Sequence, residues 1–398
     1  MLGEYGAWAA SREDDGPRTL SFRNPQWTDV REWKSAARAA LESLLCAPTE
    51  VRARDIRVTA RHEGNDLEME EISWQLPFGP RTGAYFIKPR SSGRLPGLLA
   101  FHDHGGDKHF GKRKIARFAD VLHPMAEKHQ ADYYGGMAWA NEAARRGFAV
   151  LVHDVFPFES RRIMASDVPG HVLRRLMSAP EELHELLPED VARQDRGPDL
   201  DVPADEPQAA IASYNAFAAQ HESIVAKSLF CAGLTWPGVA LAEDRAALDY
   251  LASRPDVDPD RLGCGGLSGG GLRTVFLAGL DDRIRACVCA GFMSTWKDFL
   301  LTTSYAHTWM LYVPGLARLL DFPEVLGMRA PLPSLVLATT EDPLFTHQET
   351  RRAAGMLEET YRKAGAADRF SFRVFAGPHK MDAPMQAEAF TWLEKWLA

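Results

Sequence analysis

A serine flanked by glycines is the residue whose surroundings most clearly indicate chemistry. Ser268 lies in the run Gly266-Leu267-Ser268-Gly269-Gly270, directly after an apolar stretch. Glycine at the two outer positions, Gly266 and Gly270, lets a strand turn sharply into a helix and holds the serine in the strained turn between them. Clustered glycines are unfavourable inside an ordinary helix or strand. The spacing therefore predicts a nucleophilic serine, although the short motif alone also fits a plain glycine-rich turn.

Two residues later in the chain could complete an acyl-transfer triad with this serine. Such chemistry needs a base that takes the hydroxyl proton and an acid that orients the base. Asp342 follows the apolar run 334–339, and His379 follows the run 370–375. Serine, acid and histidine in this chain order form one of the known triad arrangements. We therefore predict that Asp342 is the acid and that His379 is the base.

Each of these assignments has an alternative. An aspartate before Pro343 is typical of a turn or a helix cap, and the neighbouring Glu341 could supply the carboxylate instead. A single loop histidine is usually a surface residue, but Gly377 and Pro378 fix a turn directly before His379. Three competent residues in the right order favour the catalytic interpretation over these alternatives.

Backbone N–H groups must stabilise the negative charge of the tetrahedral intermediate. Gly269, the residue after the serine, is expected to give one of them. The other should come from the loop after an earlier buried strand, where the sequence reads His102-Asp103-His104-Gly105-Gly106. We predict the backbone of His104 as the second donor, with Gly105 as the next candidate.

The same loop has a second interpretation as a metal site. Alternate residues of an extended chain project to one side, so His102 and His104 could act as ligands together with Asp107 and His109. Two glycines within the loop suit a loop of backbone donors better. We therefore expect neither a metal nor an organic cofactor.

Several residues near the expected strand ends are candidates for lining a substrate pocket. They are His102, Gly105, Trp236, Phe292 and Trp296. Large aromatic side chains occupy binding pockets, but they also fill cores. Both interpretations stay open for the three aromatic residues.

Alternating strand and helix patterns set the scaffold for these residues. Continuous apolar runs, typical of strands buried on both faces, recur at 95–102, 148–154, 261–267, 284–290, 334–339 and 370–375. Helical patterns separate most of them, which predicts an α/β fold with a mostly parallel, doubly wound sheet and helices on both faces. Ligands bind such sheets at the carboxyl ends of the strands. The candidate residues all follow strands and should meet at that edge.

Two further segments flank or interrupt this scaffold. Residues 1–50 form an N-terminal extension with one amphipathic helix, for which Thr28 is the expected N-cap. Residues 51–398 form the main domain. Within it, 156–236 is rich in proline and contains acidic helical stretches such as 181–189, which favours a helical, lid-like insertion. A solvated elaboration without a role in binding is the alternative.

Composition excludes several classes of protein. A net charge of −8 without a basic block argues against a nucleic-acid or anionic-membrane partner. The five cysteines include no C-x-x-C pair, and neither a signal peptide nor a membrane span is evident, so we expect a cytoplasmic protein with reduced thiols. The expected partner is a small-molecule ester, and a homo-oligomer stays open.

The chain also resembles a known family. The resemblance lies in Ala242–Pro259, Gly266–Gly270, Leu280–Ile284, Tyr312–Gly315 and Asp342–Phe345. These stretches are similar to those of the acetyl xylan esterase-like and dienelactone hydrolase-like branch of the α/β-hydrolases, over most of residues 95–398. The resemblance implies an α/β-hydrolase fold and hydrolysis of a small or carbohydrate-linked ester by the triad above.

Two departures and three rivals accompany this resemblance. Asp103 stands where many relatives have glycine, and Ser268 stands where dienelactone hydrolases proper have cysteine. One rival is a serine peptidase or amidase of the prolyl-oligopeptidase kind, which would carry a large propeller before the first core strand, here at Leu95. The others are a hydrolase of C–C bonds with the same triad and a binding protein of the same fold without turnover.

Overall fold

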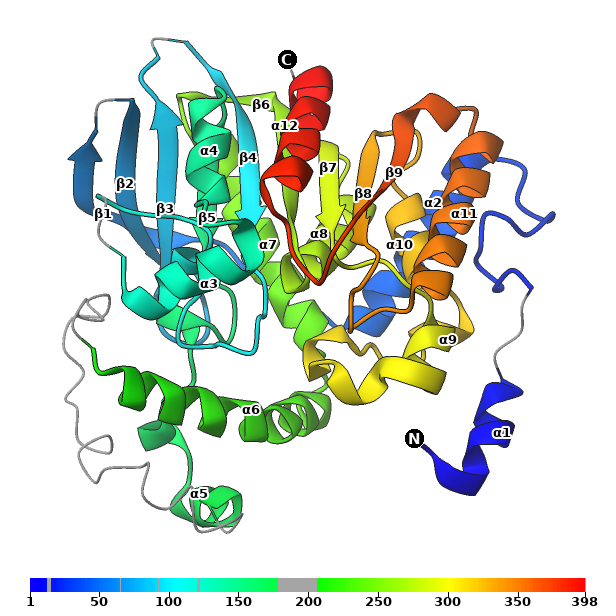
Figure 1. Ribbon diagram of the computed structural model, residues 1–398. Helices are drawn as coiled ribbons and strands as arrows, with labels where there is room; N and C mark the ends of the chain where they lie inside the picture. Colours follow the sequence, from blue (N-terminus) through cyan, green and yellow to red (C-terminus); the bar gives the residue numbers. More distant parts are fainter. Residues whose placement is uncertain (13–15, 65, 92, 120–121, 178–205, 398) are drawn as a thin grey trace.

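The computed structural model describes residues 1–12, 16–64, 66–91, 93–119, 122–177 and 206–397. The predicted acidic helical stretch at 181–189 lies outside these residues. Within them, nine strands form one sheet in the order β1-β2-β3-β5-β4-β6-β7-β8-β9 (Figure 1). The strands are β1 (Arg54–Glu63), β2 (Leu67–Gln75), β3 (Thr82–Pro89), β4 (Leu95–Phe101), β5 (Ala149–His153), β6 (Val257–Leu267), β7 (Ile284–Ala290), β8 (Ser334–Thr339) and β9 (Phe370–Phe375).

The sheet is antiparallel at one side and parallel elsewhere. β1, β2, β3 and β5 pair antiparallel, whereas β5, β4, β6, β7, β8 and β9 run parallel. The crossover that places β4 between β5 and β6 puts the end of β6 near the centre of the carboxyl edge. The predicted doubly wound, mostly parallel sheet is confirmed.

Helices cover both faces of this sheet. α2 (Val30–Leu45), α7 (Trp236–Ser253), α8 (Gly269–Leu280), α10 (Phe322–Gly327) and α11 (His347–Lys363) share one hydrophobic core. α4 (Trp139–Arg145) and α12 (Ala383–Leu397) fill the core on the other face, and α3 (Pro124–Tyr134) adds its last residue there. Parallel strands buried on both faces explain the continuous apolar runs of the sequence.

The N-terminal extension holds two helical segments before the sheet. A short 3-10 turn (Gly3–Tyr5) leads into α1 (Gly6–Ala10), and α2 follows after a connection. The expectation of one helix was therefore incomplete. The expected cap was also wrong, because the carboxylate of Asp29, rather than Thr28, accepts from the N–H groups of Arg31 and Glu32. Asp29 lies directly before the first helical residue, which is where a capping side chain reaches these groups.

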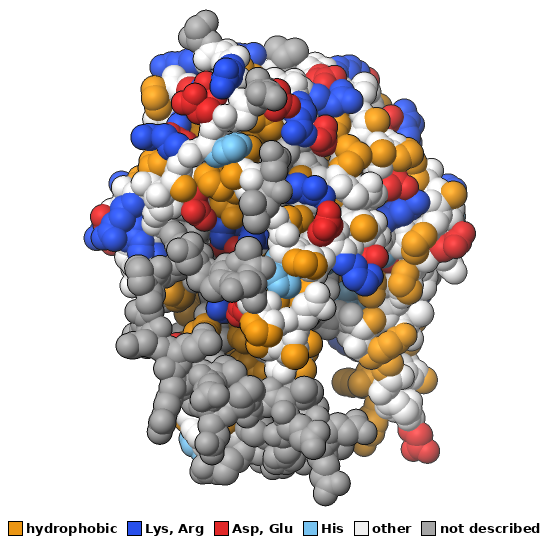
Figure 2. Space-filling model, turned by 60° about the vertical axis from the view of Figure 1, so that its left-hand side comes forward, with side chains coloured by type: hydrophobic (Ala, Val, Ile, Leu, Met, Phe, Trp, Pro, Cys, Tyr) orange, Lys and Arg blue, Asp and Glu red, His pale blue; other side chains and the backbone are white. Residues whose placement is uncertain are grey.

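The inserted segment contributes α5 (Gly170–Met177) and α6 (Gln208–Cys231). Figure 1 shows α6 running across the edge at which the parallel strands end. No single helix in the described residues is long and apolar enough to cross a membrane, and α6 and α7, which reach that apolar length only when taken together, meet at 83°. Among the described side chains on the face in Figure 2, acidic and basic groups are interspersed.

Candidate active site

Ser268 occupies the turn between β6 and α8. Its backbone has φ 58° and ψ −116°, a conformation that non-glycine residues rarely adopt and that stores strain. The turn is fixed by two bonds: the N–H of Ser268 donates to Ala290 O at 2.8 Å, and Leu272 N–H donates to Ser268 O at 2.9 Å. A Cβ on Gly266 or Gly270 would collide with the carbonyl oxygen of Phe101. The two glycines therefore permit the close approach of β4 beneath the serine.

Asp342 and His379 are joined by a short hydrogen bond. Asp342 lies in the turn after β8, and its Oδ2 accepts from His379 Nδ1 at 2.6 Å. The other oxygen, Oδ1, accepts from the N–H of Leu344 at 2.9 Å. Since Nδ1 carries the donated hydrogen, Nε2 of the neutral ring has its lone pair available. In the described part of the chain this buried Nε2 has no hydrogen-bond partner.

The serine and the histidine meet at the end of β7. Ala290, the last residue of β7, binds the N–H of Ser268, and Gly291 follows it with φ +55°. A Cβ on Gly291 would lie 3.0 Å from His379 Cε1, so the imidazole ring packs directly on this glycine. The Ser268 hydroxyl does not bond Nε2 in this conformation, as is common before substrate binds.

The backbone of His104 lies beside Gly269. A Cβ on Gly269 would be 2.9 Å from His104 N and 3.2 Å from His104 Cβ, which places the loop after β4 against the first residue of α8. Within the described residues the His104 N–H makes no hydrogen bond. The loop after β4 therefore brings a second backbone N–H next to Gly269, the residue that follows the serine.

The side chain of His104 is held by α6. Its Nε2 lies 2.7 Å from Glu222 Oε1, and its Nδ1 accepts from Gly106 N–H at 3.1 Å. The ring therefore donates from Nε2, and burial lowers the pKa of His104, which keeps the ring neutral. Glu222 also accepts from the hydroxyl of Thr308, so it links the insertion to two loops at the carboxyl edge.

Comparison with known proteins identifies the scaffold. The protein shares 26% identity over 349 residues with "Putative hydrolase YtaP" of Bacillus subtilis (strain 168), covering 87% of this chain and 93% of that protein. The Prolyl oligopeptidase family matches residues 235–370, a range that includes Ser268 and Asp342.

Solved structures match nearly the whole chain. A "putative acetyl xylan esterase" of Bacteroides fragilis NCTC 9343 aligns with a TM-score of 0.65 and 15% identity, over 94% of this chain and 83% of that chain. A "Glucuronoyl Esterase from Solibacter usitatus" aligns with a TM-score of 0.60 and 14% identity, over 97% and 99%. The protein has an α/β-hydrolase fold. The fold implied by the sequence resemblance is thereby confirmed.

The α/β-hydrolase core buries most of the residues expected to line a pocket. His102 is 1% exposed, with Nδ1 3.0 Å from Asp103 O. Phe292 and Trp296 pack around Phe322, with ring centroids 5.3 and 4.4 Å away. These three residues are therefore buried, and a role for them in a substrate pocket stays a prediction.

Of the other two expected pocket residues, one is exposed and one borders a cavity. Gly105 is exposed, with φ +53° in the loop beside His104. Trp236 is buried at the start of α7, where its indole N–H donates to Phe156 O. Its ring lines a small cavity beneath α6 that Lys108 and Glu222 also border. The exposed loop of Gly105 is thus the part of this set that substrate could reach.

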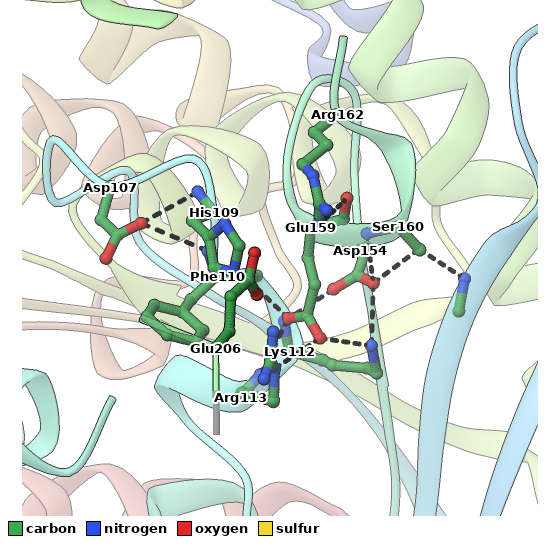
Figure 3. Close-up of polar contacts among 12 residues, drawn as sticks. Asp107, His109, Phe110, Lys112, Arg113, Asp154, Glu159, Ser160, Arg162 and Glu206 are labelled. Carbon is green, nitrogen blue, oxygen red and sulfur yellow. Dashed lines mark hydrogen bonds and ion pairs between the residues drawn. The ribbon is translucent and has the colours of Figure 1, made fainter. Parts of the chain in front are cut away.

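The four side chains considered as metal ligands turn to different partners. His102 faces a backbone carbonyl and His104 faces Glu222, while Asp107 accepts from the N–H groups of His109 and Phe110. His109 Nε2 lies 2.8 Å from Glu206 Oε2 (Figure 3). In the described residues no group of three histidine, cysteine or carboxylate side chains is arranged to hold a metal ion.

Asp103, a departure from the hydrolase family pattern, is a buried anchor of the loop. Its carboxylate accepts from Tyr134 OH at 2.5 Å and His129 Nε2 at 3.0 Å, both on α3. Burial acts to raise the pKa of Asp103, but its electrostatic interactions with His129 and Lys114 outweigh burial and hold this pKa well below its usual range. The carboxylate of Asp103 thus ties the loop to α3.

A buried ionic cluster fixes the same loop to the start of the insertion. Lys112 lies between the carboxylates of Asp154 and Glu159 (Figure 3). Its Nζ is 3.0 Å from Asp154 Oδ2 and 2.6 Å from Glu159 Oε1. Arg113 also binds Glu159, at 2.8 Å. Burial acts to raise the pKa of Glu159, but Arg113 and Lys112 outweigh it and lower this pKa. Sequence reasoning missed this cluster, because its basic and acidic residues become adjacent only through folding.

Proposed function

We propose that this protein is a serine hydrolase of carboxylic esters, in which Ser268 is the nucleophile, His379 the base and Asp342 the acid. The observation that supports this most strongly is the 2.6 Å bond from His379 to Asp342, which leaves the buried Nε2 unpaired in the described residues beside the strained serine turn. A bond in this position fixes the histidine tautomer that can take a proton.

The reaction follows from these positions. Ser268 Oγ attacks the ester carbonyl while His379 Nε2 takes the hydroxyl proton, and the carbonyl oxygen becomes an oxyanion facing the N–H groups of Gly269 and His104. His379 then gives its proton to the leaving alkoxide, and an acyl-enzyme forms. Water, deprotonated by His379, attacks the acyl group, and Ser268 recovers its proton as the acid product leaves.

The names of the structural neighbours suggest the first substrates to test. These are acetyl esters of sugars and esters of glucuronic acid. A peptidase is the second candidate, favoured by the match of residues 235–370 to the Prolyl oligopeptidase family. Both candidates use the same acyl-enzyme chemistry and differ in the leaving group.

A substrate panel with a serine variant tests the proposal. The panel contains p-nitrophenyl acetate, acetylated xylose, a methyl ester of glucuronic acid and a proline-containing peptidyl p-nitroanilide. We expect ester turnover that falls by about 10⁶-fold in Ser268→Ala, as in other serine hydrolases. Ser253→Ala, at an exposed position at the end of α7, is the matched control and should keep full activity. Turnover that survives Ser268→Ala contradicts the mechanism, and turnover of the anilide alone favours the peptidase.

A further inference from the structure

Lys114 is a buried lysine directly beneath the loop that carries His104. Its side chain is 0% exposed, and its Nζ donates to Asp103 O at 3.0 Å and to His104 O at 2.7 Å. The carboxylate of Asp103 lies farther away, at 3.9 Å, and the ring of Phe158 covers the ammonium with its centroid at 4.9 Å. The polar contacts of Nζ in the described residues are therefore all with this one loop.

We propose that Lys114 is a positioning residue of the oxyanion site, which holds the Asp103–His104 peptide in place and strengthens its N–H as a donor. The proposal rests on the function proposed above. It assigns a role to a residue outside the triad and outside the two backbone donors.

The chemical link is a single peptide unit. The carbonyl oxygen that Lys114 binds and the N–H of His104 are opposite ends of the same amide group. A cationic donor on the oxygen draws electron density from the nitrogen and makes the N–H a stronger donor, since hydrogen bonds in a chain polarise one another. The second bond, to His104 O, fixes the next peptide as well. Negative charge on the substrate oxygen then meets a donor that is already oriented.

The energetics distinguish Lys114 from its neighbour Lys112. Lys112 is buried between two carboxylates that compensate its charge. Lys114 contacts backbone carbonyls, and burial lowers its pKa in spite of the raising effect of Asp103. An apolar residue would fill a merely structural position at less cost, because burying a charge is unfavourable when its nearest carboxylate, that of Asp103, is 3.9 Å away. A charge that acts on the loop accounts for a lysine at this position.

The test is Lys114→Met, which keeps an unbranched side chain only one atom shorter and removes its charge. The measurements are kcat and KM for p-nitrophenyl acetate, inhibition by phenylboronic acid and the melting temperature. Phenylboronic acid forms a tetrahedral adduct with the serine, and its charged oxygen occupies the oxyanion site. We expect kcat to fall by about 10- to 100-fold, below the full loss of one donor, with KM unchanged within about twofold. The inhibition constant should rise by the same factor as kcat/KM falls.

Two further variants serve as positive and negative controls for this result. In Gly269→Ala the new methyl would meet His104 N, so this variant should show the same pattern of lower kcat and weaker inhibition. Lys128→Met removes an exposed lysine on α3 that pairs with Asp132, and this variant should leave both kcat and the melting temperature unchanged. An unchanged kcat in Lys114→Met, or a lower kcat with unchanged inhibition by phenylboronic acid, would overturn the proposal.

A second variant covers the case in which Lys114→Met does not fold. Lys114→Gln keeps a neutral donor for one carbonyl, and its kcat should fall by a smaller factor with KM unchanged. Wild-type kcat in this variant would equally overturn the proposal. If the wild-type enzyme shows no turnover that depends on Ser268, the proposed function fails, whereas Ser268-dependent turnover that ignores Lys114 contradicts only the role of this lysine.

Discussion

At the scale of single residues, the acid of the triad can be distinguished from its neighbour. In Asp342→Asn, an amide takes the place of the carboxylate that accepts from His379 Nδ1. An amide N–H facing Nδ1 favours the ring tautomer with its hydrogen on Nε2, which cannot take the serine proton. We expect kcat for p-nitrophenyl acetate to fall by about 10⁴-fold with little change in stability. Steady-state kinetics at neutral pH measures the effect.

Glu341 provides the matched control for this substitution. It lies next to Asp342 in the same turn, but its side chain is exposed. Glu341→Gln should therefore keep wild-type kcat. The opposite pattern, a large loss in Glu341→Gln and a small one in Asp342→Asn, would reassign the acid.

Residue types and spacing predicted the serine, acid and histidine, and the structure places all three at one edge, while their catalytic roles stay predictions. Lys114 and Glu222 were not found. Glu222 meets His104 across 118 positions of the chain, and no local pattern reveals such a contact. Asp103 was noticed only as a departure from the family, because its partners on α3 become adjacent through folding alone.

At the scale of elements, the ionic cluster around Lys112 holds the loop after β4 to the start of the insertion. Lys112→Met would leave the carboxylates of Asp154 and Glu159 buried without their shared ammonium. Removing one partner of a buried ion pair typically costs about 3–5 kcal/mol. We expect the free energy of unfolding in urea to fall by this amount. A loss below about 1 kcal/mol, typical of exposed pairs, would show that the cluster contributes little.

The sequence predicted the central strands well but missed several helices. The bounds of β7, β8 and β9 agree with the apolar runs. α3 was not predicted, because its residues are mostly polar and it is held by tertiary contacts such as the bond from Tyr134 to Asp103. β6 begins at Val257, earlier than expected, because the Pro-containing stretch forms an irregularity in the pairing with β4 instead of ending the strand.

At the scale of the whole molecule, Asp321 should make stability depend on pH. This buried residue caps α10, and burial, together with the nearby Glu324, raises its pKa to about 7. The raised pKa means that the folded protein favours the protonated carboxyl group. This contribution to stability is fully present below pH 3.8, the ordinary pKa, and is lost as the pH rises through 7. Most of the loss in unfolding free energy falls above pH 5, and between pH 5 and pH 8 it amounts to about 2–3 kcal/mol.

Asp321→Asn isolates this contribution, since asparagine can still cap a helix but does not ionise. The wild type should lose about 2–3 kcal/mol of unfolding free energy through this group between pH 5 and pH 8, and the variant should not show this loss. Urea unfolding at both pH values measures the difference. Parallel pH curves for the two proteins would contradict the raised pKa.

The overall class of fold followed from alternating patterns, but the placement of the added segments did not. The attachment of α2 depends on Arg38, which donates to Gly279 O and Asp282, more than 240 residues later in the chain. The position of α6 across the carboxyl edge depends on Glu222. Periodicity reveals which face of a helix is apolar but not which part of the molecule it covers.

The central claim is that Ser268 is a nucleophile activated by His379. Labelling with an alkyl fluorophosphonate, followed by peptide mass mapping, tests it most directly, because the reagent modifies an activated serine and the stable adduct identifies the residue. We expect one adduct per chain, on Ser268, and its rate of formation should fall by at least about 10³-fold in His379→Ala. An adduct on another residue, or labelling of Ser268 at the same rate without His379, would contradict the account.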